Sequence, residues 1–188
     1  MSLRDQLLSD GYIIIKSHFD QDFLTQCAKE IQSYLEQTPT LHSSHGKSIP
    51  DFVGRNILPQ TSSLKDDAKL HSVLKEIFGG EDYRFCSHND IGINRIVGWH
   101  KDRLNGAYSK WQKLDIWSTH QGQQHEIVKV LIYLEDHNFD NDGLKLVPGS
   151  HRHRDIKSSG WIQLRPSLGD VVIFDQRITH RGMERQVS

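Results

Sequence analysis

The second half of the chain constrains the fold most, because from residue 81 onward it consists of short apolar runs separated by turn sequences. Runs of this length that are rich in β-branched residues are typical of β-strands. The predicted strands span residues 83–88, 91–97, 127–134, 144–147, 161–164 and 170–174. The turns between the later strands are Asp140-Asn141-Asp142-Gly143, Pro148-Gly149 and Ser167-Leu168-Gly169-Asp170.

The first 80 residues are predicted to be mainly helical. Residues 20–37 form the best helix, because apolar side chains recur there at helical spacing. Further helices are expected at residues 2–11, capped by Ser2, and at residues 66–80, with a strand at residues 12–16 between the first two. Residues 38–65 lack clear periodicity and are expected to form a long loop of the kind that often covers a substrate site.

Helices followed by many short strands favour a mainly β domain with flanking α-helices, as in a β-sandwich or jelly roll. A length of 188 residues fits a single domain, with a helical part at residues 1–80 and a β core at residues 81–188. The net charge of −1 provides no basic field for nucleic acid or an anionic membrane surface.

The chain is also predicted to be cytoplasmic. No apolar run approaches the roughly 18 residues of a membrane span, and the charged N-terminus lacks the apolar core of a signal peptide. Cys27 and Cys86 lie far apart and form no CxxC motif, which fits a reducing compartment.

The tetrapeptide WHKD at residues 99–102 is a candidate metal-binding motif. Residues i and i+2 of an extended chain project to the same side, so His100 and Asp102 can provide an imidazole and a carboxylate together. A mononuclear non-haem iron site needs one more imidazole and keeps its opposite face open. An H-x-D pair alone is weak evidence, because a polar turn explains it more often.

The third ligand must come from a distant strand, and His180 is the best candidate. It lies in GDVVIFDQRITHRG, where a turn, a buried-strand run and a second short extended segment follow one another. His180 is therefore expected near a strand end, while Arg181 is expected to point to the opposite side.

Four segments together resemble the phytanoyl-CoA dioxygenase family of Fe(II)- and 2-oxoglutarate-dependent oxygenases. They are LLSDGYIIIKSHFDQDFLTQCAKEIQSYL, WHKD, LIYLEDHNFDNDGLKLVPGSHRH and GDVVIFDQRITHRG, and they span nearly the whole chain. The resemblance implies a double-stranded β-helix (jelly roll), with Fe(II) held by His100, Asp102 and His180. It implies 2-oxoglutarate as cosubstrate and hydroxylation of a small organic molecule, because family halogenases replace the carboxylate at the position of Asp102 with a small residue.

The resemblance assigns further roles near the metal. Asn94 corresponds to a position that hydrogen-bonds 2-oxoglutarate in the family, although a simple turn residue is an equal interpretation. His151 of the PGSH segment is expected to fix the adjacent loop and not to bind metal. The stretch at residues 103–125, with Tyr108, Trp111, Trp117, Lys110 and Lys113, and the basic cluster at residues 151–154 are candidate substrate surfaces; ordinary core aromatics and solvated charges are the alternative.

One family feature is missing from its usual place. The arginine that binds the far carboxylate of 2-oxoglutarate normally follows the distal histidine by roughly ten residues, beyond Ser188. Three explanations compete: a C-terminal end that is incomplete, which we favour; a substitute such as Arg185, Arg55 or Arg95; or a protein that does not use 2-oxoglutarate. If the protein does not use 2-oxoglutarate, two alternatives to the oxygenase remain: a non-catalytic β-helix binding protein and a cupin-like metalloenzyme.

Overall fold

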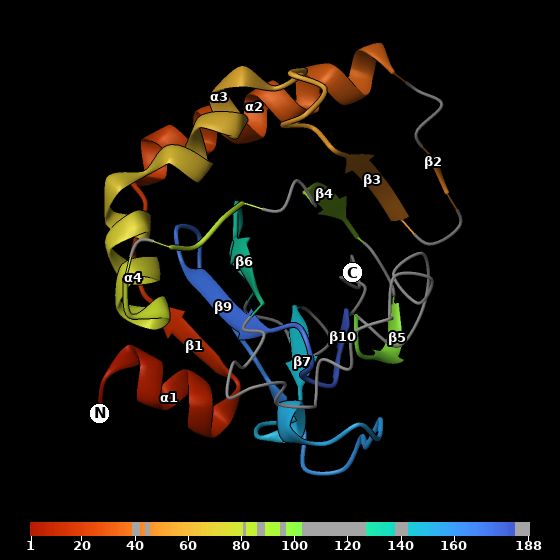
Figure 1. Ribbon diagram of the computed structural model, residues 1–188. Coiled ribbons are helices and arrows are strands. Elements are labelled where there is room, and N and C mark those ends of the chain that lie inside the picture. Colours follow the sequence, from red (N-terminus) through yellow and green to blue (C-terminus); the bar gives the residue numbers. More distant parts are fainter. Residues whose placement is uncertain are drawn as a thin grey trace.

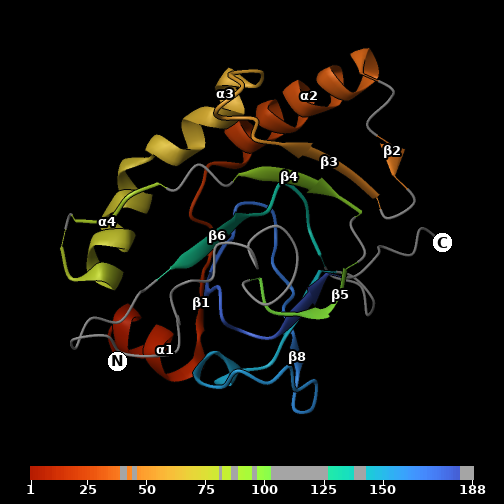
Figure 2. The same ribbon diagram turned by 45° about the vertical axis from the view of Figure 1, so that its right-hand side comes forward.

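The structure of the protein is a computed structural model, and it describes residues 1–38, 42–43, 46–80, 82–85, 89–94, 97–102, 127–137 and 143–182. In these residues, helices cover one side of an arrangement of antiparallel strands (Figures 1 and 2). The helical elements are α1 Leu3–Asp10, α2 Gln21–Gln37, α3 Pro59–Ser62 and α4 Ala68–Phe78, with short 3-10 turns η1 Ser63–Asp66 and η3 Ser150–Arg152.

The strands form three sheets in which every described pairing is antiparallel. The first sheet has the order β1-β9-β6, from Tyr12–Ile15, Val171–Asp175 and Val128–Ile132. The second has the order β5-β10-β7-β8, from Val97–His100, His180–Gly182, Leu144–Leu146 and Ile162–Gln163. The third has the order β2-β3-β4, from His42–Ser43, Gly46–Pro50 and Asp90–Ile93.

Strand β9 lies between two parts of the hydrophobic core. Its side chains alternate, so Val171 and Ile173 pack with apolar residues of α1, α2 and α4. Val172 and Phe174 point the other way and pack with Leu144 and other residues of the second sheet. This two-sided burial explains why residues 171–174 are all apolar, and it fixes the first sheet between the helices and the second sheet.

Local signals determine the ends of the helices. Ser2 accepts a hydrogen bond from the Asp5 amide in a capping box, and Gly11 ends α1 in the left-handed conformation. The Asp20 and Asp67 side chains accept hydrogen bonds from the amides of Phe23 and Leu70 and so cap α2 and α4, and Gly79 ends α4. The helices predicted at residues 2–11, 20–37 and 66–80 are thus confirmed to within about two residues.

Three expectations are corrected. Residues 38–65 are not one irregular loop: their described part contains β2, β3, α3 and η1, because β3 pairs along its length with β4. The single strand predicted at residues 91–97 is two strands, since Asn94 adopts a left-handed bend (φ 50°) after β4 and β5 begins at Val97. Residues 82–85 form no strand, and residues 86–88 lie outside the described part.

The mainly β architecture with flanking helices is the predicted fold class, the jelly roll or double-stranded β-helix. Within the described residues, none of the helices combines the length and the apolarity needed to cross a bilayer.

Candidate metal centre

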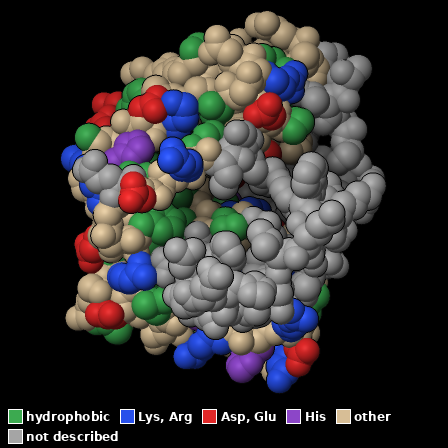
Figure 3. Space-filling view, viewed as in Figure 1, with side chains coloured by type: hydrophobic (Ala, Val, Ile, Leu, Met, Phe, Trp, Pro, Cys, Tyr) green, Lys and Arg blue, Asp and Glu red, His purple; other side chains and the backbone are tan. Residues whose placement is uncertain are grey.

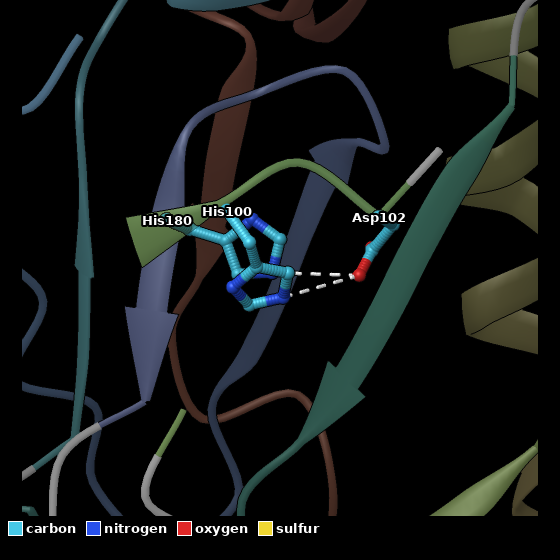
Figure 4. A group of neighbouring side chains, drawn as sticks. All are labelled: His100, Asp102 and His180. Atoms are coloured by element: carbon cyan, nitrogen blue, oxygen red, sulfur yellow. Dashed lines mark ion pairs between the residues drawn. The ribbon is translucent and has the colours of Figure 1, made fainter. Parts of the chain in front are cut away.

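His100, Asp102 and His180 converge on one point although almost eighty residues separate the first from the last (Figure 4). Each offers one ligand atom, and these atoms all lie within 4.8 Å of one another. The register of the second sheet explains the convergence, because His180 of β10 is the cross-strand partner of His100 at the end of β5. Asp102 follows two residues later and turns its carboxylate back toward both rings.

The Oδ1 atom of Asp102 is the point on which both imidazoles converge. It lies 3.5 Å from Nε2 of His100 and 3.7 Å from Nε2 of His180. The two ring centroids are 4.2 Å apart, with the ring planes inclined at 50°. Two nitrogens and one oxygen that share a single space are the donor set of a facial two-histidine, one-carboxylate site.

Backbone carbonyls orient both histidines. Nδ1 of His100 lies 2.8 Å from the Gly98 carbonyl oxygen, and Nδ1 of His180 lies 3.0 Å from that of Ile178. A carbonyl only accepts hydrogen bonds, so each Nδ1 carries the proton. In the neutral ring, Nε2 then presents its lone pair to the shared space, as a metal-binding imidazole requires.

The electrostatics of the site also suit a cation. Burial of the His180 ring lowers its pKa to about 4, so this imidazole is neutral at pH 7. Burial of the Asp102 carboxyl by itself raises its pKa, but His100, His180 and Lys129 outweigh burial and hold the pKa well below its ordinary value. At neutral pH, neither His180 nor Asp102 has to release a proton before a metal binds.

Two residues beside the predicted ligands behave as expected. His151 is buried, and its Nε2 lies 3.1 Å from the Leu8 carbonyl oxygen, so it holds the PGSH loop against α1. Arg181 points away from the ligands and places its guanidinium carbon 5.7 Å from the centroid of the Trp99 ring. The tryptophan of WHKD thus packs on the face opposite the histidines.

The predicted 2-oxoglutarate residues remain predictions. Asn94 is exposed in its left-handed bend, a conformation that asparagine tolerates better than most residues. Arg185 and Arg95 lie outside the described residues, as does the stretch at residues 103–125. Arg55, the other proposed substitute, donates hydrogen bonds to the Pro50 carbonyl and the Tyr34 hydroxyl.

The basic cluster at residues 151–154 divides into a buried and an exposed part. His151 faces α1, whereas Arg152, His153 and Arg154 are exposed. Basic and histidine side chains gather at the lower end of the face in Figure 3, where the loop after β7 lies in Figure 1. The solvated interpretation of the three exposed residues therefore fits the structure.

Two lysines near the site were not predicted. Lys101 is completely buried, and its Nζ donates to the carbonyls of Ser150 and Arg177. Lys129 of β6 forms an ion pair with Asp102, with Nζ 2.9 Å from Oδ2. In the sequence, Lys129 stands out only as a charged residue inside the apolar run VKVLIYL. Lys101 is visible only as the central residue of the H-x-D motif.

Comparison with solved structures finds the same fold in other proteins. AviO1 from Streptomyces viridochromogenes superposes with a TM-score of 0.71 at 17% identity, covering 98% of this chain and 87% of that one. HygX from Streptomyces hygroscopicus, solved with nickel and 2-oxoglutarate, gives 0.73 at 15% identity over 98% and 82%. EctD from S. alaskensis, solved with 2-oxoglutarate and 5-hydroxyectoine, gives 0.71 at 20% identity over 98% and 71%.

At these identities the structural likeness establishes the fold alone. A search of curated proteins found no significant match. The sequence itself matches the phytanoyl-CoA dioxygenase (PhyH) family over residues 7–185, which is nearly the whole chain. The match includes all four segments whose resemblance the sequence suggested, and the chain belongs to the phytanoyl-CoA dioxygenase family.

Proposed function

We propose that the protein is an Fe(II)- and 2-oxoglutarate-dependent oxygenase that hydroxylates a small organic substrate, with His100, Asp102 and His180 as the metal ligands. The observation that carries this proposal is the convergence of both Nε2 atoms on Oδ1 of Asp102. Membership in the family supports it. So does the presence of metal and 2-oxoglutarate in HygX, a structural neighbour.

The residues of the chain provide binding and orientation. The carbonyls of Gly98 and Ile178 fix the imidazoles, so that their lone pairs face one space before metal arrives. The Phe174 ring packs against His180, with centroids 4.9 Å apart, and limits water on that side. When bound, iron and 2-oxoglutarate provide the oxidising chemistry, in which dioxygen converts a C–H bond to C–OH and 2-oxoglutarate to succinate and carbon dioxide.

The retained carboxylate of Asp102 determines the type of reaction that we favour. It occupies a position that a family halogenase would leave to halide, so hydroxyl transfer is the expected outcome. EctD, solved with 5-hydroxyectoine, is a neighbour whose bound molecule carries such a hydroxyl group. The substrate class for this chain is a small organic molecule.

The test is anaerobic loading of the protein with Fe(II) and 2-oxoglutarate, followed by exposure to air and measurement of succinate. Wild-type protein is expected to form succinate even without substrate, at a slow uncoupled rate. His100→Ala and His180→Ala are expected to form none. His153→Ala is the matched control, because His153 is exposed and separate from the three ligands.

The outcomes separate the alternatives. Metal binding that depends on His100 and His180, without binding of 2-oxoglutarate, would support the cupin-like metalloenzyme. Binding of neither would support the non-catalytic module and reject the oxygenase.

A further inference from the structure

Lys129 is a charged residue in the middle of the apolar strand β6, and its position is set by strand pairing. It is the cross-strand partner of Phe174 on β9, so both side chains point to the same side of the first sheet. Phe174 belongs to the core between the first and second sheets, as does Leu131, two residues after Lys129. Lys129 therefore projects into the space between the sheets, toward the metal ligands.

The two neighbours of Lys129 along β6 confirm this direction. Val128 and Val130 pack against the core under the helices, on the opposite side of the sheet. The Lys129 side chain remains 27% exposed. An apolar residue would suit this inward position, since a lysine between two sheets loses part of its hydration.

Asp102 explains the presence of the cation. Its Oδ2 lies 2.9 Å from Nζ of Lys129, whereas its Oδ1 faces His100 and His180 at 3.5 and 3.7 Å. The two oxygens of one carboxylate thus have separate neighbours: one faces the imidazoles and the other faces an ammonium. The Asp102 side chain is only 12% exposed, so little water competes for either oxygen.

This division affects the number of open positions at the metal. A six-coordinate metal with two imidazoles and one carboxylate oxygen keeps three positions open. When bound, 2-oxoglutarate would take two of them, and dioxygen would need the third. If both oxygens of Asp102 were bound, only two positions would remain, and cosubstrate and dioxygen would compete.

We propose that Lys129 is a positioning residue that occupies Oδ2 of Asp102, so that the carboxylate binds metal through Oδ1 alone and the third position stays open. This inference rests on the proposed function. The same cation also offsets the negative charge that 2-oxoglutarate brings to the site. Lys129 acts through Asp102 and does not itself touch the metal.

Visible absorption of Co(II) tests the inference, because its ligand-field bands change with coordination number and ligand set. Lys129→Met removes the cation and keeps an unbranched side chain that is only one atom shorter. We expect Co(II) bound to Lys129→Met to show bands that differ in position and intensity from those of the wild type. We also expect the affinity of the Co(II)-loaded variant for 2-oxoglutarate to fall, because the variant lacks the cation that offsets the negative charge of the cosubstrate.

Lys145→Met is the matched control. Lys145 lies on β7, and its Nζ packs 4.2 Å from the centroid of the Trp161 ring. This variant is expected to retain the wild-type bands and affinity. Should Lys129→Met fail to fold, Lys129→Gln takes its place, because it is also neutral but keeps a polar end in the same space, and the same two changes are expected.

Failure of the inference and failure of the proposed function give different results. If wild-type protein binds Co(II) and 2-oxoglutarate, and the neutral Lys129 variant has unchanged bands and affinity, Lys129 has no positioning role. If the wild type binds no Co(II), the metal site itself is wrong and the inference falls with it.

Discussion

Nζ of Lys101 lies 2.7 Å from the carbonyl oxygen of Ser150, and this contact joins the strand that carries His100 to the PGSH loop. The same ammonium donates to the Arg177 carbonyl at 2.6 Å. The Ser150 hydroxyl in turn accepts a hydrogen bond from the Thr179 amide at 2.8 Å, immediately before His180. Lys101 therefore ties together the chain segments that position both histidines.

Lys101→Met is expected to destabilise the protein by about 2 kcal/mol. Burial lowers the pKa of Lys101 to about 8, so a buried cation has an intrinsic cost that the substitution removes. The substitution also removes two hydrogen bonds from a charged donor, each worth about 1.5–3 kcal/mol, and we expect this loss to dominate. Denaturant unfolding measures the change, and Lys29→Met on the exposed surface of α2 is the control. A variant as stable as the wild type would contradict the expectation.

Metal is expected to stabilise the folded protein by an amount that rises with the logarithm of the metal concentration above its Kd. A ligand that binds only the folded state adds about 2.7 kcal/mol at 100 times its Kd. For a chain of this length, that free energy corresponds to a rise in Tm of about 5–10 °C. Thermal unfolding with and without Ni(II) measures the shift, and a chelator should reverse it. The shift should persist in His153→Ala and disappear in His180→Ala; a shift retained in His180→Ala would place the metal elsewhere.

Helix ends and the buried strand could be predicted because their signals are local. Ser2, Gly11 and Asp20 cap or end helices through contacts within a few residues. The first four residues of β9 are all apolar because the strand is buried on both sides. By contrast, β3 exists because residues 46–50 pair with a strand more than forty residues later, and its own sequence contains no comparable signal.

The metal ligands could be predicted from the sequence, whereas the two lysines beside them could not. His100, Asp102 and His180 follow a spacing that resembles a known family. A lysine in a strand can point to either face, and only the register with Phe174 shows that Lys129 points inward. The direction of Lys101 likewise depends on the carbonyls of two distant segments, which no local pattern reveals.

Asp170→Asn is expected to destabilise the protein by about 2–3 kcal/mol, because Asp170 joins the segment after β1 to the turn before β9. The buried Asp170 carboxylate accepts from the amides of Ser17 and Ser167 at 2.9 and 2.8 Å, and from Nζ of Lys16 at 2.5 Å. An asparagine amide would turn an N–H group toward one of these donors. Denaturant unfolding at neutral pH measures the loss, and the exposed Asp66→Asn provides the control.

The same residue gives a prediction about pH. Burial of Asp170 raises its pKa, but its interactions with Lys16, Ser167 and Ser17 outweigh burial and lower the pKa below the ordinary 3.8. The stabilisation is therefore present above pH 3.8 and is lost as the pH falls toward the lower, folded-state pKa. The difference in unfolding free energy between wild type and Asp170→Asn should shrink from pH 6 to pH 3. A constant difference would mean that the charge of Asp170 contributes nothing.

Gly11→Ala and Gly79→Ala form a matched pair that isolates the packing of His151. Both glycines end a helix with positive φ, 82° and 72°, so each substitution costs about 1–2 kcal/mol of backbone strain. A Cβ at Gly11 would also lie 2.4 Å from Nδ1 of His151, whereas a Cβ at Gly79 would meet nothing within 4 Å. His151 would have to move and give up its contact with the Leu8 carbonyl, at a further cost of about 1 kcal/mol or more. Denaturant unfolding should show the larger loss for Gly11→Ala; equal losses would mean that the PGSH histidine can move from α1 without cost.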